Sequence, residues 1–145
     1  MLSEYLEPGK ILLNAEGNSY RELLSMMLDR SSVTDIPGTV DKILEREKIM
    51  PTALGKGIFL PRIVVDDIKR TEVLVTLNHG GLVFDDYGTG VANVIMLFLF
   101  SKNDDYIALL AQSLRLLNDD SLRSDLLHCR KADDVIKTVN DWEKE

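Results

Sequence analysis

The sequence is poor in the side chains that build disulfides and metal centres. It has one cysteine and two histidines in 145 residues. A single cysteine excludes an internal disulfide, and Cys129, His79 and His128 are too few soft ligands for a structural zinc site. We therefore expect no metal and no cofactor, and a reducing compartment fits the composition.

The sequence also lacks a long apolar run and a surplus of basic residues. Its longest apolar stretch, Val94–Phe100, is far shorter than the roughly 20 residues that cross a bilayer. No basic region precedes an apolar run at the start, so no signal peptide is evident. The net charge of −7 disfavours nucleic acid and anionic membranes as partners. We expect a cytoplasmic protein.

The residues that are present suffice for one folded domain. A chain of this length buries about 68–70% of its unfolded surface, and a hydrophobic content of 45% is typical of globular proteins. We find no internal repeat, low-complexity tract or linker. Residues 1–145 are therefore read as a single domain.

The first half of the chain alternates between strand and helix patterns. Lys10–Asn14 is a short apolar run between turn residues, which predicts a buried strand. Ser19 and Glu22 form a Ser-x-x-Glu capping box that opens a helix. A second helix is predicted from the Thr34–Pro37 boundary to the residue before Met50.

The second half predicts further strands and then helices. Val91–Phe100 is almost continuously apolar, as in a central strand that is covered on both faces. The other strands, turns and helices expected here are a strand at Gly57–Leu60, a strand at Thr71–Leu77, a turn at Asn78–Gly81, a short strand at Leu82–Phe84, a loop at Asp85–Gly90, and helices from Asn103, at Asp120–Arg130 and at Ala132–Trp142. The pattern predicts a layered α/β domain in which helices flank a mixed sheet.

The most informative segment is residues 54–62, Leu-Gly-Lys-Gly-Ile-Phe-Leu-Pro-Arg, with Arg46-Glu47 and Thr52 upstream. It resembles type-2 enzyme IIA domains of the sugar phosphotransferase system, the fructose, mannitol and nitrogen-related family. Those domains carry Arg-Glu, a Ser/Thr-Thr step, and then Gly-x-Gly-Ile-Ala-Ile-Pro-His. The resemblance runs from about Lys10 to Val139 and implies a sheet of about five strands.

In that family the last histidine of the motif accepts a phosphoryl group from a phosphocarrier protein and passes it on. The corresponding residue here is Arg62. An imidazole offers an unprotonated nitrogen near neutral pH, whereas a guanidinium has only donors and is no nucleophile. It can instead bind a carboxylate or phosphate through two parallel hydrogen bonds. We assign no catalytic residue.

The resemblance implies a second site position as well. Residues 106–114 are similar to a family helix whose first residues often include another histidine, and Tyr106 stands at that position. The implied binding site consists of Arg46, Thr52, Gly55, Gly57, Pro61, Arg62 and Tyr106, with the two arginines converging on one pocket. The alternative is that the glycines mark only a turn and that Arg62 is a solvated surface residue.

Other candidates have simpler interpretations. His79 reads as an exposed turn residue, His128 as a helix-face residue, and Cys129 as a packing residue without a strong cationic neighbour. Five Asp-Asp doublets, at residues 66–67, 85–86, 104–105, 119–120 and 133–134, lie at loops or helix starts. Carboxylates there cap amides and favour the helix dipole, so we expect capping and no metal site.

Three functions remain open on the sequence. The leading one is an enzyme IIA-like regulatory or binding protein that no longer relays phosphate and acts by contact with a phosphotransferase-system component, a transporter or a kinase, or by binding a small anion. The second is a working phosphotransferase component that uses another residue. The third is a receptor domain for a small anionic metabolite.

Overall fold

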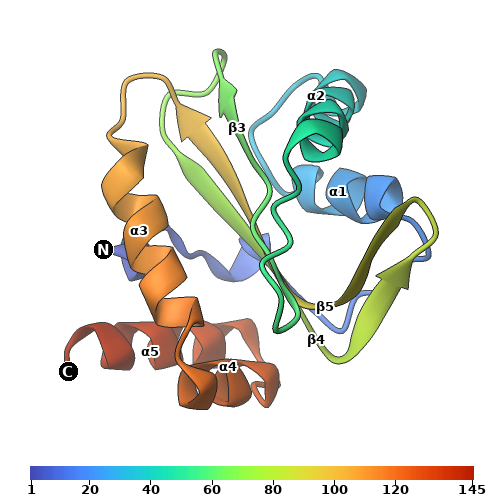
Figure 1. The fold of residues 1–145 in the computed structure, drawn as a ribbon. Coiled ribbons are helices and arrows are strands. Elements are labelled where there is room, and N and C mark those ends of the chain that lie inside the picture. Colours follow the sequence, from blue (N-terminus) through green and yellow to red (C-terminus); the bar gives the residue numbers. More distant parts are fainter.

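The computed structural model is built around one open sheet of five strands with helices on both faces (Figure 1). It describes residues 1–87 and 90–145. The strands are β1 (Ile11–Leu13), β2 (Ile58–Phe59), β3 (Arg62–Val65), β4 (Glu72–Phe84) and β5 (Tyr87–Ser101). The α-helices are α1 (Tyr20–Leu28), α2 (Ile36–Ile49), α3 (Tyr106–Leu117), α4 (Asp120–Leu127) and α5 (Ala132–Glu143), and two 3₁₀ turns, η1 (Leu2–Tyr5) and η2 (Pro8–Lys10), precede β1. The predicted layered α/β fold is confirmed.

The strand order is β1-β4-β5-β2, with β3 also paired to β5. β4 and β5 are antiparallel, while β1 is parallel to β4 and both β2 and β3 are parallel to β5. The sheet is therefore mixed, as predicted. β2 and β3 follow one another along the same side of β5, so together they form one edge of the sheet.

β5 separates two hydrophobic cores because its side chains alternate between the two faces. Val94, Met96, Phe98 and Phe100 pack with α3, α4 and α5, whereas Ile95, Leu97 and Leu99 pack with α1 and α2. Figure 1 shows the two helix layers on opposite sides of the strands. All residues of 94–100 are buried, whereas Val91 is exposed. The predicted central strand at Val91–Phe100 is therefore covered on both faces over residues 94–100.

Acidic and hydroxyl side chains begin the helices. Ser19 accepts a hydrogen bond from the Glu22 amide at 3.1 Å, and Asp105 and Asp119 cap α3 and α4. Asp86, from the turn between β4 and β5, accepts from the amides of Tyr20 and Arg21. Among the residues described, no group of three or more His, Cys, Asp or Glu could hold a metal ion. Capping is thus confirmed for three of the doublets.

Two predictions for the β4–β5 hairpin were wrong. Asn78–Gly81 is no turn, because β4 continues to Phe84 through an irregularity in its pairing between Leu77 and Leu82. Asn93 bridges that irregularity by donating from its side-chain amide to the carbonyls of residues 78 and 79. The loop predicted at Asp85–Gly90 is a turn at Asp85–Asp86 only; β5 begins at Tyr87, and Gly88 and Thr89 lie outside the described residues.

The structure also contains one strand that the sequence pattern did not predict. β3 lies at the sheet edge, where its burial is partial, and it is only four residues long, so periodicity alone cannot assign it as a strand. It positions Arg62. Within the described part of the chain, no helix has the length and apolar character needed to cross a membrane.

Candidate functional site

The loop between α2 and β2 is shaped by left-handed backbone. Gly55, Lys56 and Gly57 have φ values of 82°, 56° and 76°. A Cβ on Gly57 would lie 2.2 Å from the Asn93 side-chain oxygen, so only glycine fits. The Gly57 carbonyl accepts from the amides of Asn93 and Val94 at 2.8 and 2.9 Å. The two glycines therefore form the turn that the alternative interpretation expected.

Glu47 fixes the start of this loop from inside the protein. Its side chain is 3% exposed and accepts hydrogen bonds from both the amide and the hydroxyl of Thr52 and from the Tyr87 hydroxyl at 2.6 Å. The Thr52 carbonyl in turn accepts from the Leu60 amide. Thr52, a predicted binding residue, is thus buried, and all its polar groups have partners within the protein.

Tyrosine rings close the interior around Glu47. Tyr20 lies with its ring centroid 4.7 Å from that of Tyr87 and 5.7 Å from that of Phe59. The Tyr20 hydroxyl is buried and has no hydrogen-bond partner among the described residues. Burial, and next the charge of Glu47, raise the pKa of Tyr20 well above its ordinary value. The phenol therefore stays protonated.

Arg62 is the first residue of β3 and is half-buried. The preceding Pro61 is buried, and its carbonyl accepts from the Phe98 amide at 3.0 Å. Arg62 pairs in register with Phe98, and paired residues project to the same face of a sheet. The Arg62 side chain therefore leaves the sheet on the α3 side. Its guanidinium has no hydrogen bond or ion pair within residues 1–87 and 90–145.

Tyr106 opens α3 on that same face of the sheet. Its ring stacks on Phe100 with centroids 4.6 Å apart and planes 26° apart, and Phe100 stacks on Phe98. Tyr106 remains 38% exposed. Because Phe98 is the register partner of Arg62, two phenylalanines connect Arg62 to Tyr106. The structure thus brings these two predicted site residues to one side of the sheet.

Arg46 lies in the last turn of α2, on the opposite side. It is exposed while the adjacent Glu47 is buried, as expected for neighbours 100° apart on a helix. α2 packs beside β3 at the sheet edge (Figure 1). Arg46 and Arg62 therefore flank the β2–β3 edge from its two faces, and no hydrogen bond or ion pair among the described residues involves the Arg46 guanidinium. Their convergence on one pocket stays a prediction.

Several apolar side chains are exposed on the elements that carry Arg62 and Tyr106 and on the loop before them. They come from the loop before β2, from β3 and from α3, and they are Leu54, Val64, Ile107 and Leu114, with exposures of 52%, 42%, 72% and 39%. A groove of about 380 Å³ between the loop and α3 is lined by Leu54, Lys56, Ile58, Leu114, Arg115, Leu117 and Asn118. We call these exposed side chains and the groove the α3 face.

The two histidines lie in another part of the molecule and contact each other. The rings of His79, in β4, and His128, at the end of α4, are 4.9 Å apart between centroids. Both are exposed, and the His128 Nδ1 is 2.7 Å from the Ser124 carbonyl. The Cys129 thiol donates a hydrogen bond to the Asp125 carbonyl at 3.3 Å, and burial is the main cause that raises the pKa of Cys129. A neutral thiol agrees with its interpretation as a packing residue.

Sequence reasoning named Glu47 only as part of the Arg-Glu pair of the family motif, and it gave neither Glu47 nor Tyr87 or Tyr20 a place in the site. A signal for the first was present: Val40, Ile43 and Glu47 recur at the helical spacing of three to four residues. A glutamate on the buried side of a helix needs partners inside the protein. The tyrosines carried no comparable signal, because their contacts come from segments distant in the chain.

Comparison with known proteins identifies the family. The family model described as "Phosphoenolpyruvate-dependent sugar phosphotransferase system, EIIA 2" matches residues 4–142. The chain belongs to this family. The fructose-specific EIIA component of Haloferax volcanii is 26% identical to this chain over 115 residues. The match covers 78% of this chain and 75% of the relative.

A second relative is much longer than this enzyme IIA domain. The mannitol-specific EIICBA component of Escherichia coli is 27% identical over 106 residues, 71% of this chain but 16% of the relative. Solved structures share the fold. The nitrogen regulatory protein IIA-Ntr of Neisseria meningitidis superposes with a TM-score of 0.82 at 21% identity, covering 95% of this chain and 98% of that one. Enzyme IIAMTL, in its complex with phosphorylated enzyme IIBMTL from Escherichia coli, superposes with a TM-score of 0.75 at 23% identity. The match covers 94% of this chain and 97% of that one.

Proposed function

We propose that this enzyme IIA domain acts by binding and does not relay phosphoryl groups. The observation that carries the proposal is Arg62, an unpaired guanidinium at the start of β3 on the same face as Tyr106. A guanidinium cannot take up a phosphoryl group as an imidazole does, but it binds carboxylate and phosphate well. The site would thus still bind an anionic group of a partner, but it would not transfer a phosphoryl group.

The partner that we propose is a protein of the phosphotransferase system, or a regulated transporter or kinase, that docks on the α3 face. Exposed Val64, in the same strand as Arg62, and exposed Ile107, next to Tyr106 in α3, add apolar area to one charged anchor, a composition typical of protein contacts. The relative enzyme IIAMTL was solved in complex with phosphorylated enzyme IIBMTL. A phosphate or carboxylate on the partner would complement Arg62.

Incubation with phosphoenolpyruvate, enzyme I and the histidine phosphocarrier tests the loss of transfer. We expect intact mass spectrometry to show no phosphoryl adduct of about 80 Da on the wild-type chain. A stoichiometric adduct would overturn the proposal and favour relay through another residue. The Arg62→His variant should gain the adduct, because its imidazole would occupy the proposed acceptor position.

A titration with phosphorylated and unphosphorylated enzyme IIBMTL tests the contact. We expect amide shifts on the α3 face, stronger with the phosphorylated protein, and about tenfold weaker binding for Arg62→Gln. Arg130→Gln is the matched control, since Arg130 is an exposed arginine in the turn between α4 and α5. Equal affinity of the Arg62 variant and wild type would contradict the assigned role of this guanidinium.

A further inference from the structure

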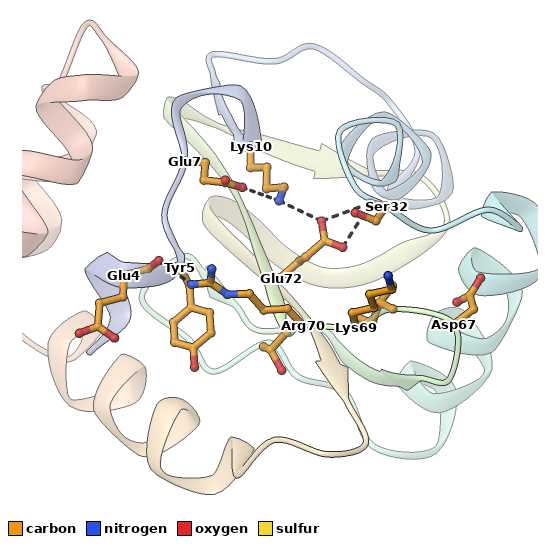
Figure 2. A pocket seen from close by; sticks show the side chains of 11 residues that line it. Glu4, Tyr5, Glu7, Lys10, Ser32, Asp67, Lys69, Arg70 and Glu72 are labelled. Atoms are coloured by element: carbon orange, nitrogen blue, oxygen red, sulfur yellow. Dashed lines mark hydrogen bonds and ion pairs between the residues drawn. The ribbon is translucent and has the colours of Figure 1, made fainter.

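The charges around Glu72 are paired within the protein. In the cavity of about 370 Å³ beside the N-terminal 3₁₀ turns, Glu72 accepts from the Ser32 amide and pairs with the Lys10 ammonium (Figure 2). The same ammonium pairs with Glu7. Because the buried carboxylate already has its cation and its hydrogen bonds, this cluster needs no ligand.

The two histidines of the chain differ from this cluster, because they meet at the surface. His79 lies in β4, and His128 directly follows α4. Both side chains are exposed, and the ring centroids are 4.9 Å apart with the planes at 67°. The contact arises from the fold, since α4 packs against β4. Two imidazoles from distant segments thus share one exposed place.

The hydrogen bond of His128 leaves one of its ring nitrogens available. Nδ1 lies 2.7 Å from the Ser124 carbonyl. Since a carbonyl only accepts, Nδ1 carries the proton in the neutral ring and Nε2 carries the lone pair. A histidine that binds a metal almost always donates its other N–H in this way, which fixes the tautomer and orients the ring. His128 therefore has the arrangement of a metal ligand.

His79 supplies the second imidazole from an anchored backbone. Its amide donates to the Asn14 side-chain oxygen at 3.5 Å, and its carbonyl accepts from the Asn93 side-chain amide at 3.4 Å. Within residues 1–87 and 90–145, the His79 ring makes no hydrogen bond or ion pair. The ring is exposed and can rotate on its side-chain torsions, so its nitrogens are available to a ligand.

The spacing of the two rings fits one shared ion. Zinc binds imidazole nitrogens at about 2.0–2.1 Å in tetrahedral geometry, so two imidazoles on one ion have ring centroids about 5 Å apart. The observed 4.9 Å is close to this value. His128 also ends α4, where the helix carbonyls favour positive charge.

The charges beside His128 are balanced. The groove that it lines also contains two carboxylates and two cations, and these are Asp125, Asp134, Arg130 and Lys131. No surplus of positive charge in this groove therefore opposes the approach of a metal ion.

We propose that His79 and His128 together bind a divalent transition-metal ion such as Zn²⁺ or Ni²⁺. Imidazole suits these ions, whereas Mg²⁺ and Ca²⁺ prefer oxygen ligands. Since the described residues contain no group of three metal-binding side chains, water fills the other positions and the ion exchanges readily. A bound ion connects α4 to β4 and stabilises the folded state by mass action.

Titration of the untagged, ¹⁵N-labelled chain with NiCl₂ locates the site, because bound Ni²⁺ is paramagnetic and broadens the signals of nearby amides. We expect the amides around residues 79 and 128 to broaden first. Calorimetry with ZnCl₂ should give a dissociation constant of about 100 µM. His79→Gln and His128→Gln should each weaken zinc binding at least about tenfold, and MgCl₂ should have no effect.

Two control variants test which side chains bind the ion. Cys129→Ser removes the neighbouring thiol, and Arg62→Gln removes the guanidinium of the proposed function; both should leave the zinc affinity unchanged. Absence of binding up to about 1 mM ZnCl₂, broadening centred elsewhere, or an unchanged affinity in either histidine variant would overturn the assignment. Loss of binding in Cys129→Ser would make the thiol a ligand and refute the two-histidine site.

Discussion

Two glutamates are buried in this enzyme IIA domain, and they are held in different ways. Among the described residues, the donors to Glu47 are neutral groups of Thr52 and Tyr87. Glu72 is bound by a backbone amide and by the ammonium of Lys10. The first arrangement fixes a loop close in sequence, while the second ties together three distant segments. The same side chain thus shapes a candidate site in one region and joins chain segments in the other.

Removal of Glu47 should have the largest effect on stability. Glu47→Ala leaves two donors of Thr52 and the Tyr87 hydroxyl without this partner, and we expect a loss of about 4 kcal/mol in the free energy of unfolding. Urea denaturation measures it. Glu45→Ala, at an exposed position of the same helix, is the control and should change stability by less than about 0.5 kcal/mol. A loss below about 1 kcal/mol for the Glu47 variant would show that the network contributes little.

Removal of the cation beside Glu72 should have the next largest effect. Lys10→Met leaves a buried carboxylate without its ammonium, and we expect a loss of about 2 kcal/mol near pH 7. Burial lowers the pKa of Lys10, but hydrogen bonds and charges from Glu7 and Glu72 outweigh it, so the net pKa is raised. The charged Lys10 therefore makes its full contribution to the free energy of unfolding below the pKa of lysine in the unfolded chain, about 10.4. This contribution is lost as pH rises through the raised pKa of Lys10 in the folded protein.

The pH dependence separates charge from packing at this position. The stability difference between wild type and Lys10→Met should narrow when denaturation is measured above about pH 10.5. A difference that stays constant to about pH 12 would attribute the effect to the aliphatic stem of the lysine and not to its charge.

A smaller loss is expected at the start of α1. Burial raises the pKa of Asp86, but hydrogen bonds from Tyr20, Arg21 and Ser19 lower it more, so the net pKa is below its usual value. Asp86→Ala should cost about 1 kcal/mol at neutral pH. The ionised Asp86 contributes this stability above the pKa of aspartate in the unfolded chain, about 3.9. The contribution disappears as pH falls through the lowered pKa of Asp86 in the folded protein. Asp85→Ala, the neighbour in the same turn, serves as control.

The smallest effects are expected where cations have no partner. Arg62→Gln and Lys69→Gln should each change the free energy of unfolding by less than about 0.5 kcal/mol, because neither side chain makes a hydrogen bond or ion pair in the described structure. Thermal and urea unfolding measure this. A loss above about 1 kcal/mol would mean that the side chain has a structural role. For Arg62, it would remove the support for a guanidinium that is free to bind a partner.

The sequence predicted the layered fold and most helices because these depend on local patterns. Ser19 and Asp119 signal helix starts within a few residues, and the apolar run before Phe100 signals the central strand. The β4–β5 hairpin was mispredicted because Asn78–Gly81 has turn composition. Its extended course depends on pairing with β5 and on Asn93, which lies far along the chain.

The candidate site was predictable only in part. The family resemblance supplied Arg62 and Tyr106, and the register with Phe98 and the stack through Phe100 explain how they reach one face. Glu72 with Lys10 and Ser32 could not be found in the same way. Three segments distant in the chain supply those contacts, and no spacing within one segment predicts them.

The close approach of Gly57 to Asn93 has a consequence for how such chains are recognised. Since any larger residue would collide with that amide oxygen, the fold requires glycine whether or not the domain carries out chemistry. Gly57 can therefore persist whether or not the domain transfers phosphoryl groups. Under the proposed assignment, the residue after Pro61 would report on phosphoryl transfer more directly than Gly57 does.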